Sequence, residues 1–335
     1  MTTTTTAKQQ IKSMYLWMAV VIVIAVPVLI FMNANYGLTG LIGGGILTII
    51  GIAACYEIEG RGSDRPARLV TYAFLALIVF AFLFPIIWMT MTSLKTAAET
   101  AKPLQLLPQI AQWKNFPEAM AKLDFQNGLS NTIVVTVLCV IGQVLSCSLV
   151  GFGFAKFRFP GREGLFIVML ATMMLPGQVT MIPVFILFRS MGLVDNLAAL
   201  IIPAWFGSAF FVYLFRQFFS SIPNEVLEAA RVDGASNWRI FWQLMLPMSW
   251  PVIAVVTIYT FIGTWNDFMG PLIYMNSKEK ATIALGLANF TGKYGSTDVH
   301  LLMAASLVTM IPCILVFFAA QKYFVESEFS AAVKG

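Results

Sequence analysis

The chain has 335 residues, of which 59% are hydrophobic and 11% are charged, and its formal net charge is +5. Soluble domains carry about 25% charged residues, so this composition excludes an ordinary soluble protein. Apolar runs near the length of a membrane span recur along the whole chain, and we predict an all-α, polytopic membrane helical bundle of about eight transmembrane helices. The positive charge is expected to come from basic loops on one membrane face and indicates no nucleic-acid partner.

The first 68 residues are expected to form a tail and an extra helical hairpin. Residues 1–14 begin with a threonine run and predict a cytoplasmic tail, and apolar runs at 15–32 and about 36–56 predict two spans. A cleaved signal peptide is the alternative for the first run, but the residues after it form a poor small-residue cleavage site. Gly40 and Gly44 have the spacing that allows close helix contact. We therefore expect a retained hairpin with a charged loop, spanning 15–68.

Six more apolar runs follow the hairpin. They lie at about 69–91, 131–154, 164–187, 198–219, 249–273 and 299–320. Several of these runs contain prolines, which either kink packed helices or break helices that line a wet cavity; as a set they favour a transporter. Residues 321–335 are expected to form a cytoplasmic C-terminal tail.

The distribution of arginines predicts the topology. With eight spans and a cytoplasmic N-terminus, every arginine except Arg189 falls on the cytoplasmic side. The lysines divide less cleanly, because several lie in the long segment 92–130. Long loops translocate with little regard to charge, so this does not change the prediction.

Residues 223–247 form a polar interruption between apolar runs and predict a helix, a turn and a second helix. Pro223 suits a helix start, where a missing N–H costs nothing. Gly234 can end the first helix in a left-handed conformation. Ser236 can cap the second helix, and Pro247 is expected to stop it. The positive-inside rule places this stretch on the cytoplasmic side.

The sequence contains no motif for catalysis or nucleotide binding. It has no GxxxxGK[ST] phosphate loop, no GxSxG elbow and no HExxH pair. The four cysteines show no CxxC spacing, and His300 is the only histidine. We predict no catalytic residue, no cofactor, no metal site and no ATP-binding site in this chain.

Polar side chains inside the predicted spans are candidates for a solute pathway, because they cost free energy unless they face the bundle or a cavity. Asp267 can instead be a helix-end residue near the outer interface, and Trp265 an aromatic anchor there. Aromatic faces with hydroxyl and amide groups would suit a neutral sugar. The candidate pathway residues are Gln143, Gln178, Tyr259, Trp265, Asn266 and Asp267.

The stretch at 223–247 resembles the EAA motif of ABC importer permeases, written EAA-x3-G-x9-I-x-LP. Glu228-Ala229-Ala230, Gly234 and Leu246-Pro247 match it, and Leu244 replaces the isoleucine. The segment Phe157-Arg158-Phe159-Pro160-Gly161 and the chain end Ala331-Ala332-Val333-Lys334-Gly335 are similar to MalG-type carbohydrate permeases. The likeness begins near residue 69, so the first two spans lie outside the six-span pattern of that family.

The resemblance implies a permease domain at 69–320 in a bacterial plasma membrane, with both termini cytoplasmic. It implies four kinds of partner: a second, MalF-like permease subunit, two cytoplasmic ABC ATPase subunits, an extracytoplasmic sugar-binding protein and membrane lipid. The helix at 223–233 would be a coupling helix seated on one ATPase. The residues implied in coupling are Glu225, Glu228, Ala229, Ala230, Asp233, Gly234, Leu246 and Pro247.

Other functions remain open from the sequence. An importer of the same class could carry a polyol or glycerol phosphate, but a phosphorylated solute would demand basic groups, and the spans offer almost none beyond Arg189 and Arg216. A secondary transporter working alone would show an internal repeat and embedded ionisable relays, whereas only Asp267 lies well inside a span. A membrane scaffold without transport is disfavoured by the coupling motif.

Overall fold

The computed structural model describes residues 64–101, 105–290 and 298–332, and every regular element in these ranges is a helix. The chain divides into two compact units, Met1–Trp88 and Met89–Gly335. The tail expected at 1–14 and the two spans expected at 15–32 and 36–56 lie outside the described residues. The residues beyond 332 do as well.

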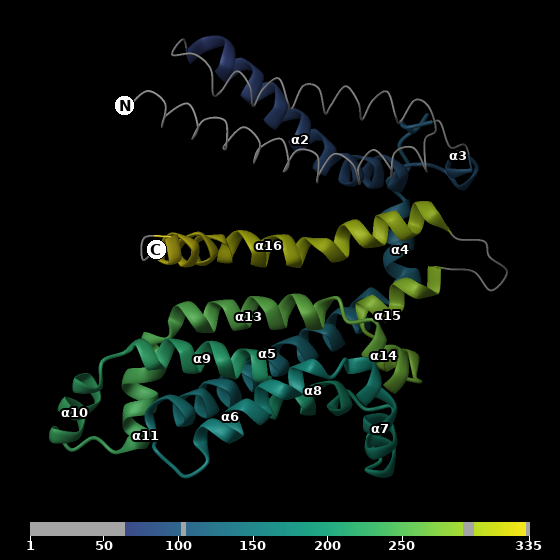
Figure 1. The fold of residues 1–335 in the computed structure, drawn as a ribbon. Helices are drawn as coiled ribbons and strands as arrows, with labels where there is room; N and C mark the ends of the chain where they lie inside the picture. Colours follow the sequence, from purple (N-terminus) through teal and green to yellow (C-terminus); the bar gives the residue numbers. More distant parts are fainter. Residues whose placement is uncertain (1–63, 102–104, 291–297, 333–335) are drawn as a thin grey trace. The chain divides into compact units, whose positions relative to one another are not determined.

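The described helices vary widely in length, and the longest ones correspond to predicted spans (Figure 1). In chain order they are α2 (Asp64–Ser93), α3 (Ala97–Thr100), α4 (Asn115–Leu123), α5 (Phe125–Lys156), α6 (Arg162–Ala171), η1 (Thr172–Met174), α7 (Gly177–Ser190), α8 (Ala198–Trp205), α9 (Ala209–Ser221), α10 (Asn224–Val232), α11 (Asn237–Ile240), η2 (Phe241–Met245), α12 (Leu246–Met248), α13 (Trp250–Trp265), α14 (Met269–Tyr274), η3 (Lys278–Lys280), α15 (Ile283–Leu287), η4 (Ala288–Phe290) and α16 (Val299–Ala332).

Three described segments are long and apolar enough to cross a membrane: Phe125–Lys156, Ala198–Ser221 and Val299–Ala319. Two bent pairs raise this number to five if each counts as one span. The pair Arg162–Met174 and Gly177–Ser190 bends by 99°, and the pair Asn237–Met248 and Trp250–Trp265 bends by 75°. The first bend falls next to Pro176 and Gly177, inside the predicted span at 164–187. The total of eight spans stays a prediction.

α5 is the central helix of the unit Met89–Gly335, where it packs against α8, α9 and α13. Glycine permits the close approach to α9: a Cβ built on Gly151 would lie 2.6 Å from Cβ of Phe215 and 3.0 Å from the backbone nitrogen of Arg216. Two residues along the same helix, a Cβ on Gly153 would meet nothing within 4 Å. The close contact between α5 and α9 therefore requires glycine at position 151 but not at position 153.

These two glycines give a matched prediction. Gly151→Ala forces α5 and α9 apart, and we expect it to destabilise the protein by about 1–3 kcal/mol, as overpacking of a core does. Gly153→Ala has open space and gains helix propensity of up to about 1 kcal/mol, so its melting temperature stays equal or rises. Thermal unfolding of both variants in detergent, followed by tryptophan fluorescence, measures the difference. Equal melting temperatures would contradict this packing.

The Phe125 end of α5 is fixed to the segment that precedes α15. The side-chain amide of Asn131 donates to the carbonyl oxygens of Glu279 (2.7 Å) and Ala281 (3.0 Å). The hydroxyl of Thr132 accepts a hydrogen bond from the backbone N–H of Ile283 at 2.9 Å. These bonds fix the Phe125 end of α5 to the end of the unit that contains α14 and α15 (Figure 1). α10 and α11 lie at the opposite end of the unit.

A second clamp at this end is built around Asp195, in the loop between α7 and α8. Its carboxylate accepts hydrogen bonds from the hydroxyl of Ser277 and from the backbone N–H groups of Ser277 (2.9 Å) and Asn276 (3.0 Å). These bonds, and the nearby Lys280 ammonium, hold the pKa of the Asp195 carboxyl well below its usual value. The loop before α8 is thereby tied to the loop after α14.

Candidate functional site

α10 has the short helical form that the sequence predicts for the first half of the 223–247 stretch. Pro223 directly precedes the helix, and Gly234 ends it with φ +79°. The N–H of Ala235 donates to the carbonyl of Ala230 (2.9 Å), and that of Gly234 donates to the carbonyl of Arg231 (3.0 Å). This pair of bonds is the Schellman arrangement, in which a left-handed glycine satisfies the last carbonyls of a helix. Gly234 therefore sets where the chain turns.

The two faces of α10 differ. On the inner face Leu227 is buried, and the half-buried side chains of Val226 and Ala230 pack beside it in the same apolar cluster. The opposite face exposes side chains one and two helical turns apart, namely Glu225, Glu228, Ala229 and Val232. The Val232 side chain is 87% exposed. Val232 thus places an apolar side chain, open to solvent, on the same face as the Glu225 and Glu228 carboxylates.

Aromatic side chains pack α11 and the π-helix η2 against the ends of α5 and α9. Phe152 of α5 lies with its ring centroid 6.0 Å from that of Phe219 on α9 and 5.5 Å from that of Phe241. Trp238 of α11 packs at 6.0 Å on Phe241. The inner face of α10 joins the same cluster through Leu227. A displacement of α10 would therefore press on a close-packed core that joins two long helices.

The second half of the stretch differs from the prediction. The Ser236 hydroxyl accepts a hydrogen bond from the N–H of Arg239 (3.3 Å) and caps α11 as expected. The helix that Pro247 was expected to stop ends at Met248, one residue further on, and the chain bends by 75° before the helix that begins at Trp250. The preceding segment Phe241–Met245 is a π-helix. Its wider turn accommodates a proline that has no N–H to donate.

The eight residues implied in coupling lie together on this element, with different exposure. Ala230 and Leu246 are half-buried against the apolar cluster, and the others are exposed: Glu225, Glu228, Ala229, Asp233, Gly234 and Pro247. Two further exposed residues on this element were not predicted to take part in coupling: Val232 and Trp238, the latter 60% exposed. Val232 was detectable, because it follows Glu225 by seven residues and so shares its face.

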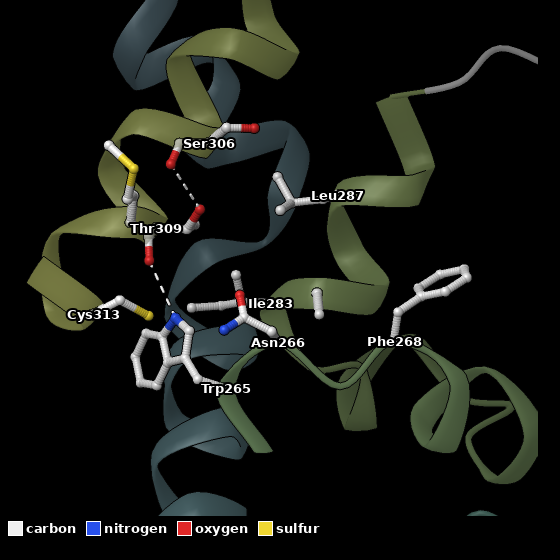
Figure 2. A pocket seen from close by; sticks show the side chains of 10 residues that line it. Trp265, Asn266, Phe268, Ile283, Leu287, Ser306, Thr309 and Cys313 are labelled. Carbon is white, nitrogen blue, oxygen red and sulfur yellow. Dashed lines mark hydrogen bonds between the residues drawn. The ribbon is translucent and has the colours of Figure 1, made fainter. Parts of the chain in front are cut away.

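A cavity of about 430 Å³ lies at the opposite end of the unit, between the end of α13, α15 and α16 (Figure 2). The Trp265 side chain forms part of its wall and donates from Nε1 to the carbonyl oxygen of Thr309 on α16, at 3.1 Å. None of the described residues that line the cavity is charged: Trp265, Asn266, Phe268, Ile283, Ala284, Leu287, Ser306, Thr309, Met310 and Cys313. The lining combines apolar surface with an amide, a thiol and two hydroxyl groups.

Two of the six candidate pathway residues, Trp265 and Asn266, line this cavity. Asn266 is exposed and donates to the carbonyl of Ile262 at 2.8 Å, whereas Trp265 is only 5% exposed. Asp267 follows them at the end of α13, where its carboxylate accepts from the N–H of Gly270 (3.0 Å). The predicted span at 249–273 is therefore broken here, because Asp267 turns the chain into α14.

The other three candidates lie elsewhere. Tyr259 is exposed on α13, with its ring 6.5 Å from that of Phe210 on α9. Gln143 accepts a hydrogen bond from the Cys147 thiol within α5 (3.1 Å). Gln178 is exposed at the start of α7 and does not line the cavity. The structure thus gathers Trp265, Asn266 and Asp267 but not the other three.

Comparison with known proteins places this architecture in one family. Residues 147–327 match the family model described as "Binding-protein-dependent transport system inner membrane component". The chain is 31% identical over 262 residues to the diacetylchitobiose uptake system permease protein NgcG of Streptomyces coelicolor, covering 78% of this chain and 87% of that protein. It is 33% identical over 275 residues to the sn-glycerol-3-phosphate transport system permease protein UgpE of Agrobacterium fabrum, covering 78% and 96%.

A solved structure shows the same fold. The crystal structure of a bacterial ABC transporter involved in the import of the acidic polysaccharide alginate contains a chain 26% identical to this one. The superposition has a TM-score of 0.69 and covers 79% of this chain and 98% of that chain. The matched family model, the similar permease proteins and the shared fold together show that this chain belongs to the inner membrane components of binding-protein-dependent transport systems.

Proposed function

We propose that the chain is the permease subunit of an ATP-driven sugar importer and that α10 is its coupling helix. α10 carries the proposal, because its inner face is fixed to the ends of α5 and α9 and its outer face exposes Glu228 and Val232. A helix with these two faces can pass the movement of an attached subunit to the spans. The energy source is then a pair of separate ABC ATPase subunits.

The arrangement of the importer follows from this role. The Lys156 end of α5 faces the cytoplasm with α10, and the Phe125 end faces outward, so both chain termini are cytoplasmic. Residues 69–320 form the permease domain, and residues 15–68 add a membrane hairpin to it. A second permease subunit completes the translocation path, and an extracytoplasmic binding protein delivers the solute.

The solute is a sugar without phosphate groups. The cavity beside Asn266 has an uncharged lining, and a phosphorylated solute would leave its charge unpaired there. Trp265 and Asn266 line the cavity and contact the solute there. Asp267, Tyr259, Gln143 and Gln178 do not line it and lie elsewhere along the pathway. NgcG and a lactose permease protein, LacG of Rhizobium radiobacter, 31% identical over 262 residues, are named for sugars.

Uptake by the reconstituted importer tests this function. Proteoliposomes containing both permease subunits and the ATPases are supplied with the binding protein and with one labelled solute at a time: a neutral oligosaccharide, a uronate oligosaccharide or sn-glycerol-3-phosphate. We expect uptake of the neutral sugar that requires internal ATP and the binding protein. Uptake of sn-glycerol-3-phosphate alone would contradict the sugar assignment, and uptake by this chain alone, driven by an ion gradient, would contradict the importer.

A further inference from the structure

The side chain of Lys156 joins three helices at the base of α10. It is the last residue of α5, and its ammonium group donates to the backbone carbonyl of Ile222 at 2.6 Å and to Oδ1 of Asn224 at 3.1 Å. Ile222 directly follows α9, which ends at Ser221, and Asn224 is the first residue of α10. One cation thus contacts the residues on both sides of Pro223.

The local chemistry explains why a cation lies here. The last carbonyls of a helix have no donor within the helix, and Pro223 has no N–H that could supply one. The Lys156 ammonium satisfies the carbonyl of Ile222, at the negative end of the α9 dipole. The carboxylate of Glu225, on the first turn of α10, attracts the same charge. Arg158, two residues further along the chain, is exposed and makes no such contact in the described residues.

The Lys156 contact can affect movement far from α10, because the other end of α5 is also fixed. α5 runs without a break from Lys156 to Phe125, and near Phe125 it holds the segment before α15 through Asn131 and Thr132. Two residues, Ile222 and Pro223, separate α9 from α10. Movement of α10 would bend this short connection unless contacts beside it resist, namely the apolar cluster under Leu227 and the Lys156 ammonium at the base of α10.

We propose that Lys156 is a positioning residue for transport, which ties α10 to α5 so that movement of α10 reaches the far end of the unit. This inference rests on the proposed coupling role of α10. Without the tie, the ATPases still bind and hydrolyse ATP, but α5 follows α10 less closely. The property that changes is therefore the number of solute molecules moved per ATP hydrolysed.

The test compares four forms of the complete importer in proteoliposomes: wild type, Lys156→Met, Lys156→Arg and Arg158→Met. Sugar uptake and ATP hydrolysis are measured in the same vesicles. In Lys156→Met we expect the ratio of sugar to ATP to fall by roughly tenfold, because losing hydrogen bonds from a charged donor shifts the equilibrium between tied and untied positions of α10 by about that factor. Lys156→Arg retains the donors and restores the ratio, and Arg158→Met, which removes a neighbouring charge, leaves it unchanged.

The outcomes separate the inference from the proposed function. A wild-type ratio in Lys156→Met contradicts the inference, as does a fall of the same size in Arg158→Met. Asn224→Ala gives a second measure if Lys156→Met fails to assemble: it removes one of the two acceptors of the Lys156 ammonium, and we expect a ratio below the wild-type value, so that a wild-type ratio would contradict the inference. No ATP-driven uptake by the wild-type importer would contradict the proposed function and this inference with it.

Discussion

A Gly234→Pro variant inserts into the membrane but does not transport sugar. The native residue has φ +79° and donates its N–H to the carbonyl of Arg231. Proline fixes φ near −65° and has no N–H, so it can satisfy neither condition. We expect the end of α10 to open and Trp238, on the following helix, to leave its place on Phe241. Uptake by proteoliposomes and the amount of chain in the membrane fraction measure the two effects.

Two alanine variants serve as controls for this result. Gly234→Ala keeps the N–H and meets no atom within 4 Å, so it costs only the left-handed backbone strain, about 1–2 kcal/mol. Gly161→Ala has the same strain in another loop, at φ +77°. We expect Gly234→Ala to reduce uptake partly and Gly161→Ala to leave it near the wild-type level. Normal uptake by Gly234→Pro would show that the turn after α10 has no part in coupling.

Charge reversal at Glu228 has the second large expected effect. In the part of the chain that the structure describes, the exposed Glu228 carboxylate accepts no hydrogen bond and forms no ion pair. Its substitution therefore leaves this chain folded, and the charge is free to contact a basic group on an ATPase. In Glu228→Lys, like charges repel, and we expect the ATPase no longer to copurify and uptake to be lost.

A neutral variant of Glu228 and a charge reversal at a distant position test whether the loss of ATPase binding is specific to the charge at position 228. Glu228→Gln keeps the shape and hydrogen-bonding oxygen of the side chain, so we expect weakened binding and residual uptake. Glu279→Lys reverses another exposed charge, at the opposite end of the unit, and the ATPase should copurify with it as with wild type. Copurification of the ATPase with Glu228→Lys at the wild-type level would contradict the proposed contact.

The local features of the coupling element follow from the sequence. The left-handed turn at Gly234 and the cap by Ser236 depend on one or two residues each, and both are confirmed. Pro247 was expected to stop the second helix, which ends at Met248, one residue further on. The π-helix before it, at Phe241–Met245, was not predicted, because such a helix has no simple sequence signal.

The contacts that unite the site were not predictable, because they join residues far apart in the chain. Lys156 contacts a carbonyl 66 residues away, and Trp265 donates to one 44 residues away. Hydropathy places each of these residues near the end of a helix but does not say which helices are neighbours. The break after Trp265 was missed for a different reason: the apolar run continues across Asp267, whose carboxylate accepts a hydrogen bond from the N–H of Gly270 in the short helix α14.

The central claim is that α10 is seated on an ATPase subunit, and photo-cross-linking from Val232 tests it most directly. A benzophenone amino acid is placed at Val232, which is 87% exposed on the outer face of α10, and at Glu279 as the control at the opposite end. On irradiation of the assembled importer, we predict a cross-link from position 232 to the ATPase and none from position 279. An importer that transports sugar but gives no ATPase cross-link at 232, or an equal one at 279, would contradict the account.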